Sequence, residues 1–290
     1  MRNGISRELK RYTNDSLGYL PDRSQEDARR FARRNVSLFR SAKLSSYVIE
    51  KLKLGFSPEQ IAGRMKLENN PIRVSHETIY KYIYSEEGRK QKLSALLTRQ
   101  KLRRTKWYSK KPKKSHIPDT ASIKARPISI EKRKTKGHFE GDLVVFRAVK
   151  SANVTTLVER KSRFVKLVYN TSKYTNEVIA GIRNTLGTLP KSHCKSITFD
   201  RGTEFAAYKN LGLTTFFCNP HSPWQKGSNE NFNGRFRRYL PKSFDPTKLS
   251  QALLDNIANI MNNQPRKCLG FRTPNEVFYG KSIRCVALDP

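Results

Sequence analysis

The stretch Gly-His-Phe-Glu-Gly-Asp-Leu-Val-Val-Phe at residues 137–146 decides the fold. Its apolar and β-branched residues from Phe139 to Phe146 predict a buried β-strand with Asp142 near its middle. Two further segments of this kind follow at Val154–Glu159 and Arg163–Tyr169, and polar turns separate them. Strands joined by such short connections indicate an antiparallel meander.

The pattern then alternates between helices and strands. The elements predicted after the meander are a helix at Thr175–Leu186, a strand at Lys195–Phe199, a short helix at Thr203–Leu211, a strand at Leu213–Cys218, a helix from about Ser228 and a final helix at Leu249–Met261. This order is that of a ribonuclease-H-like core, a mixed sheet with helices on both faces. We therefore predict an α/β fold with a ribonuclease-H-like (retroviral-integrase-like) catalytic core, preceded by small all-α helix-turn-helix segments.

Three acidic residues occupy informative places in this order. Asp142 lies within the first strand, Asp200 follows the fourth strand and Glu230 opens a helix. The first and fourth strands would be neighbours, and carboxylates brought so close repel one another unless cations stabilise them. We predict that Asp142, Asp200 and Glu230 are catalytic metal ligands that hold two Mg²⁺ ions, with Mn²⁺ as a substitute. Glu140 shares the strand face of Asp142 and is an alternative ligand.

Other residues near these carboxylates are candidates for supporting roles. Glu204 follows Asp200 by four residues; it is either a further ligand or a first-turn carboxylate favoured by the helix dipole. Asn233 lies three residues after Glu230, on the same helix face. Trp224 is interpreted first as a core side chain, because aromatic residues are mostly buried. The alternative is that Trp224 packs an active-site loop or stacks on a DNA base.

The composition indicates a polyanionic partner. Lys and Arg number 58 against 24 Asp and Glu, which gives a net charge of +34. Basic side chains gain affinity for nucleic acid by releasing counterions from phosphates. The predicted DNA contacts are Arg7, Lys10, Arg11, Lys81, Lys113, Lys114, Lys226, Arg235, Arg237 and Arg238. No apolar run has membrane-spanning length and the amino terminus does not resemble a signal peptide, so we expect a cytoplasmic protein without a membrane partner.

The segment before the meander predicts short helices with clear boundaries. Residues 46–54 have helical apolar spacing and end at Gly55, Ser57-Pro58-Glu59-Gln60 is a helix start, and Ser75 caps a third helix. Such a set is either a helix-turn-helix module or a small connecting bundle, and the basic charge favours the first. The predicted divisions are 1–42, a segment of basic helices; 43–100, the helix-turn-helix-like module; 101–136, a basic linker; 137–245, the catalytic domain; and 246–290, a C-terminal helix and tail. The linker is either a solvated charge run or an arm laid along phosphates, and the overall charge favours the arm.

Several motifs together resemble one family. Gly137–Asp142, Phe199–Glu204 and Asn219–Pro241 look like three catalytic motifs, Asn262–Lys267 and Arg272–Glu276 like a family tail, and Ser57–Ile61 and Ser75–Tyr80 like a second DNA-binding module. Over nearly its whole length the chain resembles bacterial DDE transposases of the insertion-sequence-thirty family. The resemblance implies a ribonuclease-H-like catalytic domain, Mg²⁺ use, and cleavage and strand transfer of double-stranded DNA at terminal inverted repeats. It also implies joining to target DNA, a homo-oligomer on two DNA ends and association with the bacterial nucleoid.

Three departures from the family pattern matter. Phe139 stands where a Trp is common, and only 29 residues, 201–229, separate Asp200 from Glu230. Residues 3–11 resemble the end of a first helix-turn-helix. The resemblance therefore implies that residues 1–42 are a remnant of a first DNA-binding module and that the chain is an amino-terminally truncated product. The alternative function is therefore a DNA-binding remnant that is catalytically weak or inactive. An RNA-associated basic protein is a weaker alternative, because RNA-binding modules need no such carboxylates.

Overall fold

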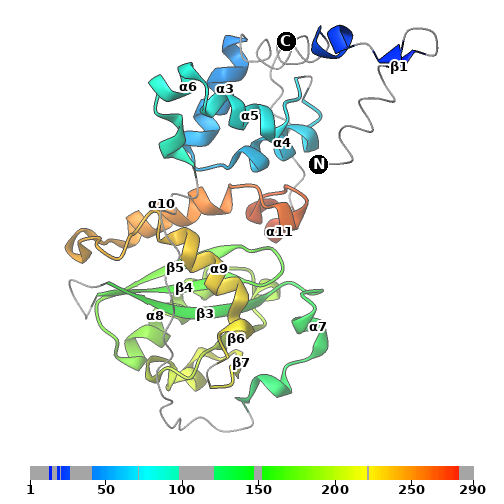
Figure 1. The fold of residues 1–290 in the computed structure, drawn as a ribbon. Helices are drawn as coiled ribbons and strands as arrows, with labels where there is room; N and C mark the ends of the chain where they lie inside the picture. Colours follow the sequence, from blue (N-terminus) through cyan, green and yellow to red (C-terminus); the bar gives the residue numbers. More distant parts are fainter. Residues whose placement is uncertain are drawn as a thin grey trace. The chain divides into compact units, whose positions relative to one another are not determined.

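The computed structural model divides the chain into two compact units, the first comprising residues 1–102 and 284–290 and the second residues 103–283 (Figure 1). It describes residues 13–14, 18–19, 21–26, 41–70, 72–97, 121–146, 152–220 and 222–280. Within these ranges, no helix has the length and apolar character needed to cross a bilayer.

The first unit is built from short helices whose ends follow the capping predictions. Its elements are strands β1 (Thr13–Asn14) and β2 (Gly18–Tyr19), helices α3 (Ala42–Lys53), α4 (Pro58–Leu67), α5 (His76–Ile83) and α6 (Glu86–Lys90), and a 3₁₀ turn, η2 (Leu93–Leu96). Ser57 and Gln60 form the predicted capping box, and Ser75 accepts a hydrogen bond from the Thr78 backbone N–H. Gly55 has φ +81°, the left-handed conformation that ends a helix. Side chains from α3, α4 and α5 share one buried core, which contains Leu44, Val48, Ile61, Met65, Ile79 and Ile83.

The second unit is built on a mixed sheet. Its strands are β3 (His138–Val145), β4 (Asn153–Glu159), β5 (Val165–Asn170), β6 (Ser196–Phe199) and β7 (Thr214–Phe217), in the spatial order β5-β4-β3-β6-β7. The pairs β3–β4 and β4–β5 are antiparallel, whereas β3–β6 and β6–β7 are parallel. The predicted meander is confirmed, and so is the predicted pairing of the first strand with the fourth.

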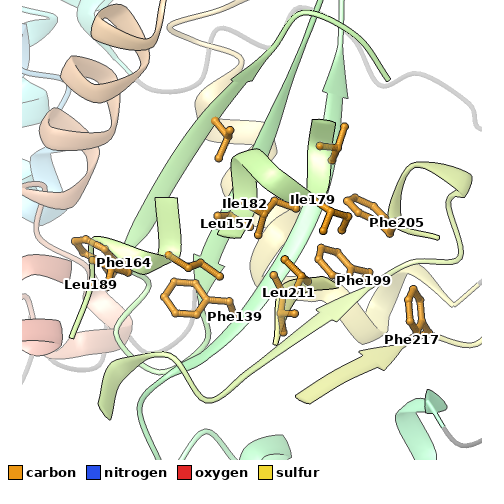
Figure 2. Close-up of a cluster of buried hydrophobic side chains, with 14 of the residues drawn as sticks. Phe139, Leu157, Phe164, Ile179, Ile182, Leu189, Phe199, Phe205, Leu211 and Phe217 are labelled. Atoms are coloured by element: carbon orange, nitrogen blue, oxygen red, sulfur yellow. The ribbon is translucent and has the colours of Figure 1, made fainter. Parts of the chain in front are cut away.

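Helices cover both faces of this sheet (Figure 1). They are α8 (Thr175–Gly187), α9 (Gly227–Phe236) and α10 (Gln251–Asn262). Phe139 of β3 belongs to the apolar cluster that includes α8 (Figure 2), and Val144 belongs to the cluster that includes α9 and α10. Successive strand residues point to opposite faces, so Asp142 lies on the same side as Val144, under α9.

The C-terminal part of the unit contributes to the core. Helix α11 (Pro274–Tyr279) buries Phe278, whose ring stacks on Phe164 with centroids 4.1 Å apart. The same ring meets the edge of Phe139 at 6.4 Å. Short 3₁₀ turns complete the unit at η5 (Lys191–His193), η8 (Pro223–Lys226), η9 (Pro246–Lys248) and η10 (Lys267–Leu269). The segment predicted as a tail therefore packs on the sheet as far as the structure describes it.

The predicted helix at Thr203–Leu211 is wrong in type. The structure has two 3₁₀ turns there, η6 (Thr203–Phe205) and η7 (Tyr208–Leu211). Between them, the Ala207 backbone N–H donates to the Thr175 side chain at 2.9 Å, so it is not available to a helical carbonyl. That tertiary contact interrupts the helix that the sequence pattern favoured.

Part of the predicted basic linker has defined structure. Residues 121–136 contain η4 (Ile123–Ala125) and α7 (Ile128–Glu131). Ser122 forms a parallel bridge with Phe217, so this segment lies beside β7. The rest of the linker, 101–120, lies outside the described residues.

Candidate active site

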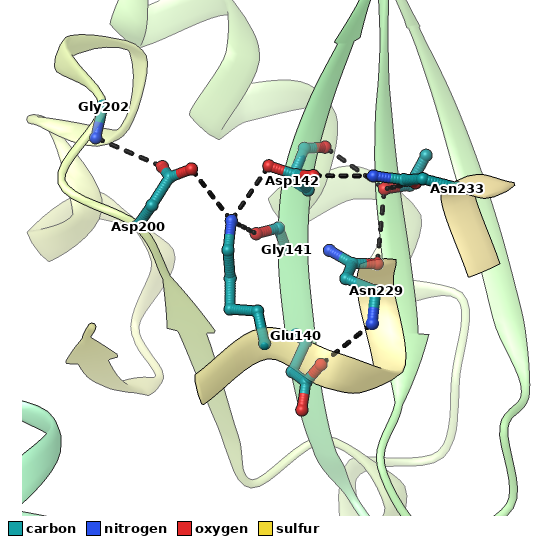
Figure 3. A network of polar contacts seen from close by, with 9 residues as sticks. Glu140, Gly141, Asp142, Asp200, Gly202, Asn229 and Asn233 are labelled. Carbon is teal, nitrogen blue, oxygen red and sulfur yellow. Dashed lines mark hydrogen bonds and ion pairs between the residues drawn. The ribbon is translucent and has the colours of Figure 1, made fainter. Parts of the chain in front are cut away.

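The structure brings Asp142 and Asp200 together around one cation (Figure 3). Asp142 lies within β3, and Asp200 directly follows β6, the parallel neighbour of β3. The ammonium Nζ of Lys226 lies 2.9 Å from Asp142 Oδ1 and 2.9 Å from Asp200 Oδ2. The same nitrogen donates to the Gly141 carbonyl at 3.3 Å. Three oxygen atoms, two from β3 and one from the residue after β6, therefore surround a single positive charge.

Both carboxylates are oriented by the protein. Asn233 Nδ2 donates to Asp142 Oδ2 at 2.7 Å, and the Gly202 backbone N–H donates to Asp200 Oδ1 at 3.2 Å. In each aspartate one oxygen is thus anchored and the other faces the shared cation. The side chains are 25% and 45% exposed for Asp142 and Asp200, so a substrate can reach both from solvent.

Lys226 is itself buried, with 6% of its surface exposed. Burial lowers the pKa of its ammonium, but the charges of Asp142 and Asp200, and the hydrogen bonds to them, outweigh burial and raise that pKa. The side chain therefore remains charged. Sequence analysis predicted a DNA contact for Lys226; contact with DNA requires the ammonium to leave the two carboxylates.

Glu230 is not part of this cluster in the structure. It lies in the first turn of α9, as predicted, and is exposed. Within the described ranges, no three His, Cys, Asp or Glu side chains lie close enough together to hold a metal ion. Lys226 precedes Glu230 by four residues and Asn233 follows it by three, so all three lie on one side of the helix start. The role of Glu230 as a ligand stays a prediction.

A buried ion pair fixes α9 against β3. Glu140 is fully buried, and its Oε1 lies 2.6 Å from Arg160 Nη1. Its second oxygen accepts the Asn229 backbone N–H at 3.0 Å, in the first turn of α9 (Figure 3). Both oxygens of Glu140 accept from protein donors, and the alternative of Glu140 as a metal ligand stays a prediction. Glu140 positions the helix that carries Glu230.

Glu204 lies in η6 close to the aspartates. Burial raises the pKa of its carboxyl, and the negative charges of Asp200 and Asp142 raise that pKa further. Its supporting role stays a prediction.

The interpretation of Trp224 as a core residue is wrong. Its side chain is 72% exposed, on the short turn η8 that precedes α9. Lys226 occupies the inward position of the same turn. Residues two apart in a 3₁₀ turn point in different directions, so Trp224 faces solvent.

The predicted DNA contacts of α9 differ in their surroundings. Arg235 Nη2 donates to Gln264 at 2.8 Å, and Arg237 Nη2 donates to the Val145 carbonyl at 2.9 Å. Both guanidinium groups are therefore tied to the protein, whereas Arg238 is exposed. Of the other predicted contacts, Lys81 is exposed on α5, whereas Arg7, Lys10, Arg11, Lys113 and Lys114 lie outside the described residues.

We predict that Gly141→Ala destabilises the second unit by about 1–3 kcal/mol, because an added methyl group would overpack the space between Gly141 and the Phe199 ring. A Cβ at Gly141 would lie 2.3 Å from the ring of Phe199, which is fully buried and stacked on Phe205. Urea denaturation measures the change. Gly187→Ala is the matched control, because its Cβ would meet nothing within 4 Å. A Gly141→Ala protein as stable as wild type would contradict the close packing behind Asp142.

The chain is similar to several transposases of insertion sequences. No protein-family profile matches the sequence. Transposase InsI for insertion sequence element IS30A from Escherichia coli (strain K12) is 36% identical over 287 residues, which cover 94% of this chain and 74% of the relative. The transposase for insertion sequence element IS4351 from Bacteroides fragilis is 34% identical, over 96% of this chain and 86% of the relative. The transposase for insertion sequence element IS1086 from Cupriavidus metallidurans is 37% identical, over 77% and 68%.

The mixed sheet, the oriented aspartates and these relatives define the class of protein, which is a transposase, an enzyme that processes DNA. Identity of this level over most of the chain also fixes the family. The chain belongs to the IS30 (insertion-sequence-thirty) family of transposases.

Proposed function

We propose that this transposase catalyses divalent-cation-dependent cleavage and strand transfer of DNA at the terminal inverted repeats of an insertion sequence. The observation that carries the proposal is the pair of aspartates that present one oxygen each to a shared cation. The sheet order β5-β4-β3-β6-β7, with helices on both faces, supports a ribonuclease-H-like catalytic core of the DDE type.

The donor set suits a divalent cation. Mg²⁺ is usually held by one or two carboxylates, with waters and substrate phosphates as its other ligands. Asp142 and Asp200 provide two carboxylates, and the ammonium of Lys226 already marks a position where both bind positive charge. We propose that Asp142, Asp200 and Glu230 hold two Mg²⁺ ions, for which Mn²⁺ can substitute.

Some residues of the chain orient the two aspartates, and others hold helix α9 in place. Asn233 and the Gly202 N–H set the directions of the two aspartates. Glu140 and Arg160 hold the start of α9, whose first turn carries Glu230, and Asn233 follows Glu230 by three residues on the same helix face. Bound divalent cations would activate the attacking water or 3′-hydroxyl and stabilise the leaving oxygen.

The first unit is proposed to bind the terminal repeats. Helices α4 and α5 follow one another across a short connection, and α5 exposes His76, Tyr80 and Lys81. This arrangement supports a helix-turn-helix with α5 as the helix that enters the major groove. The net charge of +34 supports phosphate contacts over a wide surface. Assembly of two or more copies on paired DNA ends is part of the proposal.

The test is a cleavage assay on DNA that carries matched terminal repeats. We expect nicks at the repeat ends with Mg²⁺ or Mn²⁺ and no nicks after chelation of the metal. In Glu230→Gln the cleavage rate should fall by at least about 100-fold, because several kcal/mol of charge stabilisation would disappear. Glu86→Gln is the matched control, since Glu86 is an exposed carboxylate of the first unit. Cleavage that survives chelation, or that Glu230→Gln retains, would overturn the proposal.

A further inference from the structure

Lys226 occupies the position where the proposed catalytic cation would bind. Its ammonium contacts the unanchored oxygen of each aspartate, Asp142 Oδ1 and Asp200 Oδ2 (Figure 3). The Gly141 carbonyl is its third oxygen neighbour. The oxygens that Lys226 engages are therefore the ones that the protein leaves available for a metal ion.

The charges at this position do not balance. Two carboxylates and one ammonium leave one net negative charge, whereas one divalent cation would neutralise both carboxylates. An ammonium at 2.9 Å from both oxygens also fills the space between them, so a metal ion cannot use the same oxygens while Lys226 remains. The lysine and the metal are thus alternative occupants.

Lys226 also has a means of leaving. It is the N-cap residue of α9 and ends η8, and its charge sits on a stem of four methylene groups with rotatable bonds. A displaced ammonium regains hydration or pairs with an anion such as a DNA phosphate. Exchange therefore needs a change of side-chain rotamers and does not require the helix to unfold.

We infer that Lys226 is the internal counter-ion of the metal-free Asp142–Asp200 pair and that a divalent cation must displace it. The inference rests on the proposed function. Lys226 then has two roles: it keeps the carboxylates together before metal binds, and it lowers the affinity for metal in the absence of DNA. A nearby phosphate would draw the ammonium away and favour metal binding.

Binding of Mn²⁺ to the DNA-free protein, measured by titration calorimetry, tests the competition. We expect Lys226→Met to bind Mn²⁺ at least about tenfold more tightly than wild type, the lower end of the effect that one adjacent charge has on a carboxylate. Lys226→Arg keeps the positive charge, so its affinity for Mn²⁺ should stay as weak as that of wild type. Lys191→Met is the matched control, because Lys191 is an exposed lysine on η5.

A second measurement uses the wild-type protein, so it does not depend on how a variant folds. Acetylation of lysines by an activated ester, followed by mass spectrometry, reports how accessible each amine is. We expect acetylation of Lys226 to rise several-fold when Mn²⁺ is added, with acetylation of Lys191 unchanged. Equal labelling of Lys226 with and without Mn²⁺, at a concentration that saturates the site, would overturn the inference.

The outcomes also separate this inference from the proposed function. If Asp142→Asn abolishes Mn²⁺ binding but Lys226→Met binds no more tightly than wild type, the metal site stands and the competition is wrong. If neither wild type nor Lys226→Met binds Mn²⁺ in a manner that depends on Asp142, the proposed metal site itself fails.

Discussion

Asp142→Asn is expected to reduce DNA cleavage by at least about 1,000-fold while leaving DNA binding intact, because the change removes several kcal/mol of charge stabilisation. Asp142 contributes one of the two carboxylate oxygens around the shared cation, and Asn233 fixes its other oxygen. An amide has the same shape but carries no charge, so it would bind a divalent cation poorly. Cleavage rate on repeat-ended DNA and binding by mobility shift measure the two effects separately.

The control for this prediction is Asp255→Asn. Asp255 is an exposed aspartate on α10, and its side chain accepts a hydrogen bond from Gln251, which an amide oxygen can also accept. Circular dichroism should show the same fold in both variants. An Asp142→Asn protein that keeps more than about a tenth of the cleavage rate, a loss of less than about 1.4 kcal/mol, would show that this carboxylate is not a catalytic ligand.

Arg160→Met is expected to destabilise the second unit by about 3–5 kcal/mol, the usual cost of leaving a buried charge without its partner. Glu140 is fully buried, and Arg160 is its ion-pair partner at 2.6 Å. Without the guanidinium, the carboxylate would have to be protonated or the site would have to open to water. The midpoint of urea denaturation measures the loss.

A double-mutant cycle separates the charge effect from the loss of packing. The variant Glu140→Gln with Arg160→Met removes both charges and should recover part of the stability lost in Arg160→Met alone. It also keeps an oxygen at position 140 that can accept the Asn229 N–H. If the double variant is less stable than Arg160→Met, the buried charge is not the source of the loss.

Local sequence signals predicted most of the fold because the structures they specify are local. The β-branched runs became β3, β4 and β5, and the caps at Ser57 and Ser75 begin α4 and α5. The pairing of β3 with β6 followed from the order of the elements. The prediction of one helix at 203–211 was wrong, because the side chain of Thr175, about thirty positions away, accepts the hydrogen bond of the Ala207 N–H.

Sequence analysis predicted that Asp142 and Asp200 approach each other, which the structure shows, but it missed the contacts that hold them. Lys226 meets Asp142 across 84 positions, and no spacing rule links them. Lys226 was predicted to contact DNA, because the chain is strongly basic and a lysine is normally a surface charge. Arg160 was missed for a similar reason. It matters because it neutralises the buried carboxylate of Glu140, and the burial of Glu140 is visible only in the packed structure.

Anomalous diffraction from crystals grown with Mn²⁺ tests most directly whether Asp142 and Asp200 form the metal site of this transposase. The expected result is an anomalous peak about 2.0–2.2 Å from a carboxylate oxygen of each aspartate, with the Lys226 ammonium withdrawn. A map in which Lys226 still bridges the two carboxylates, with no peak between them at Mn²⁺ concentrations that support cleavage, would contradict it.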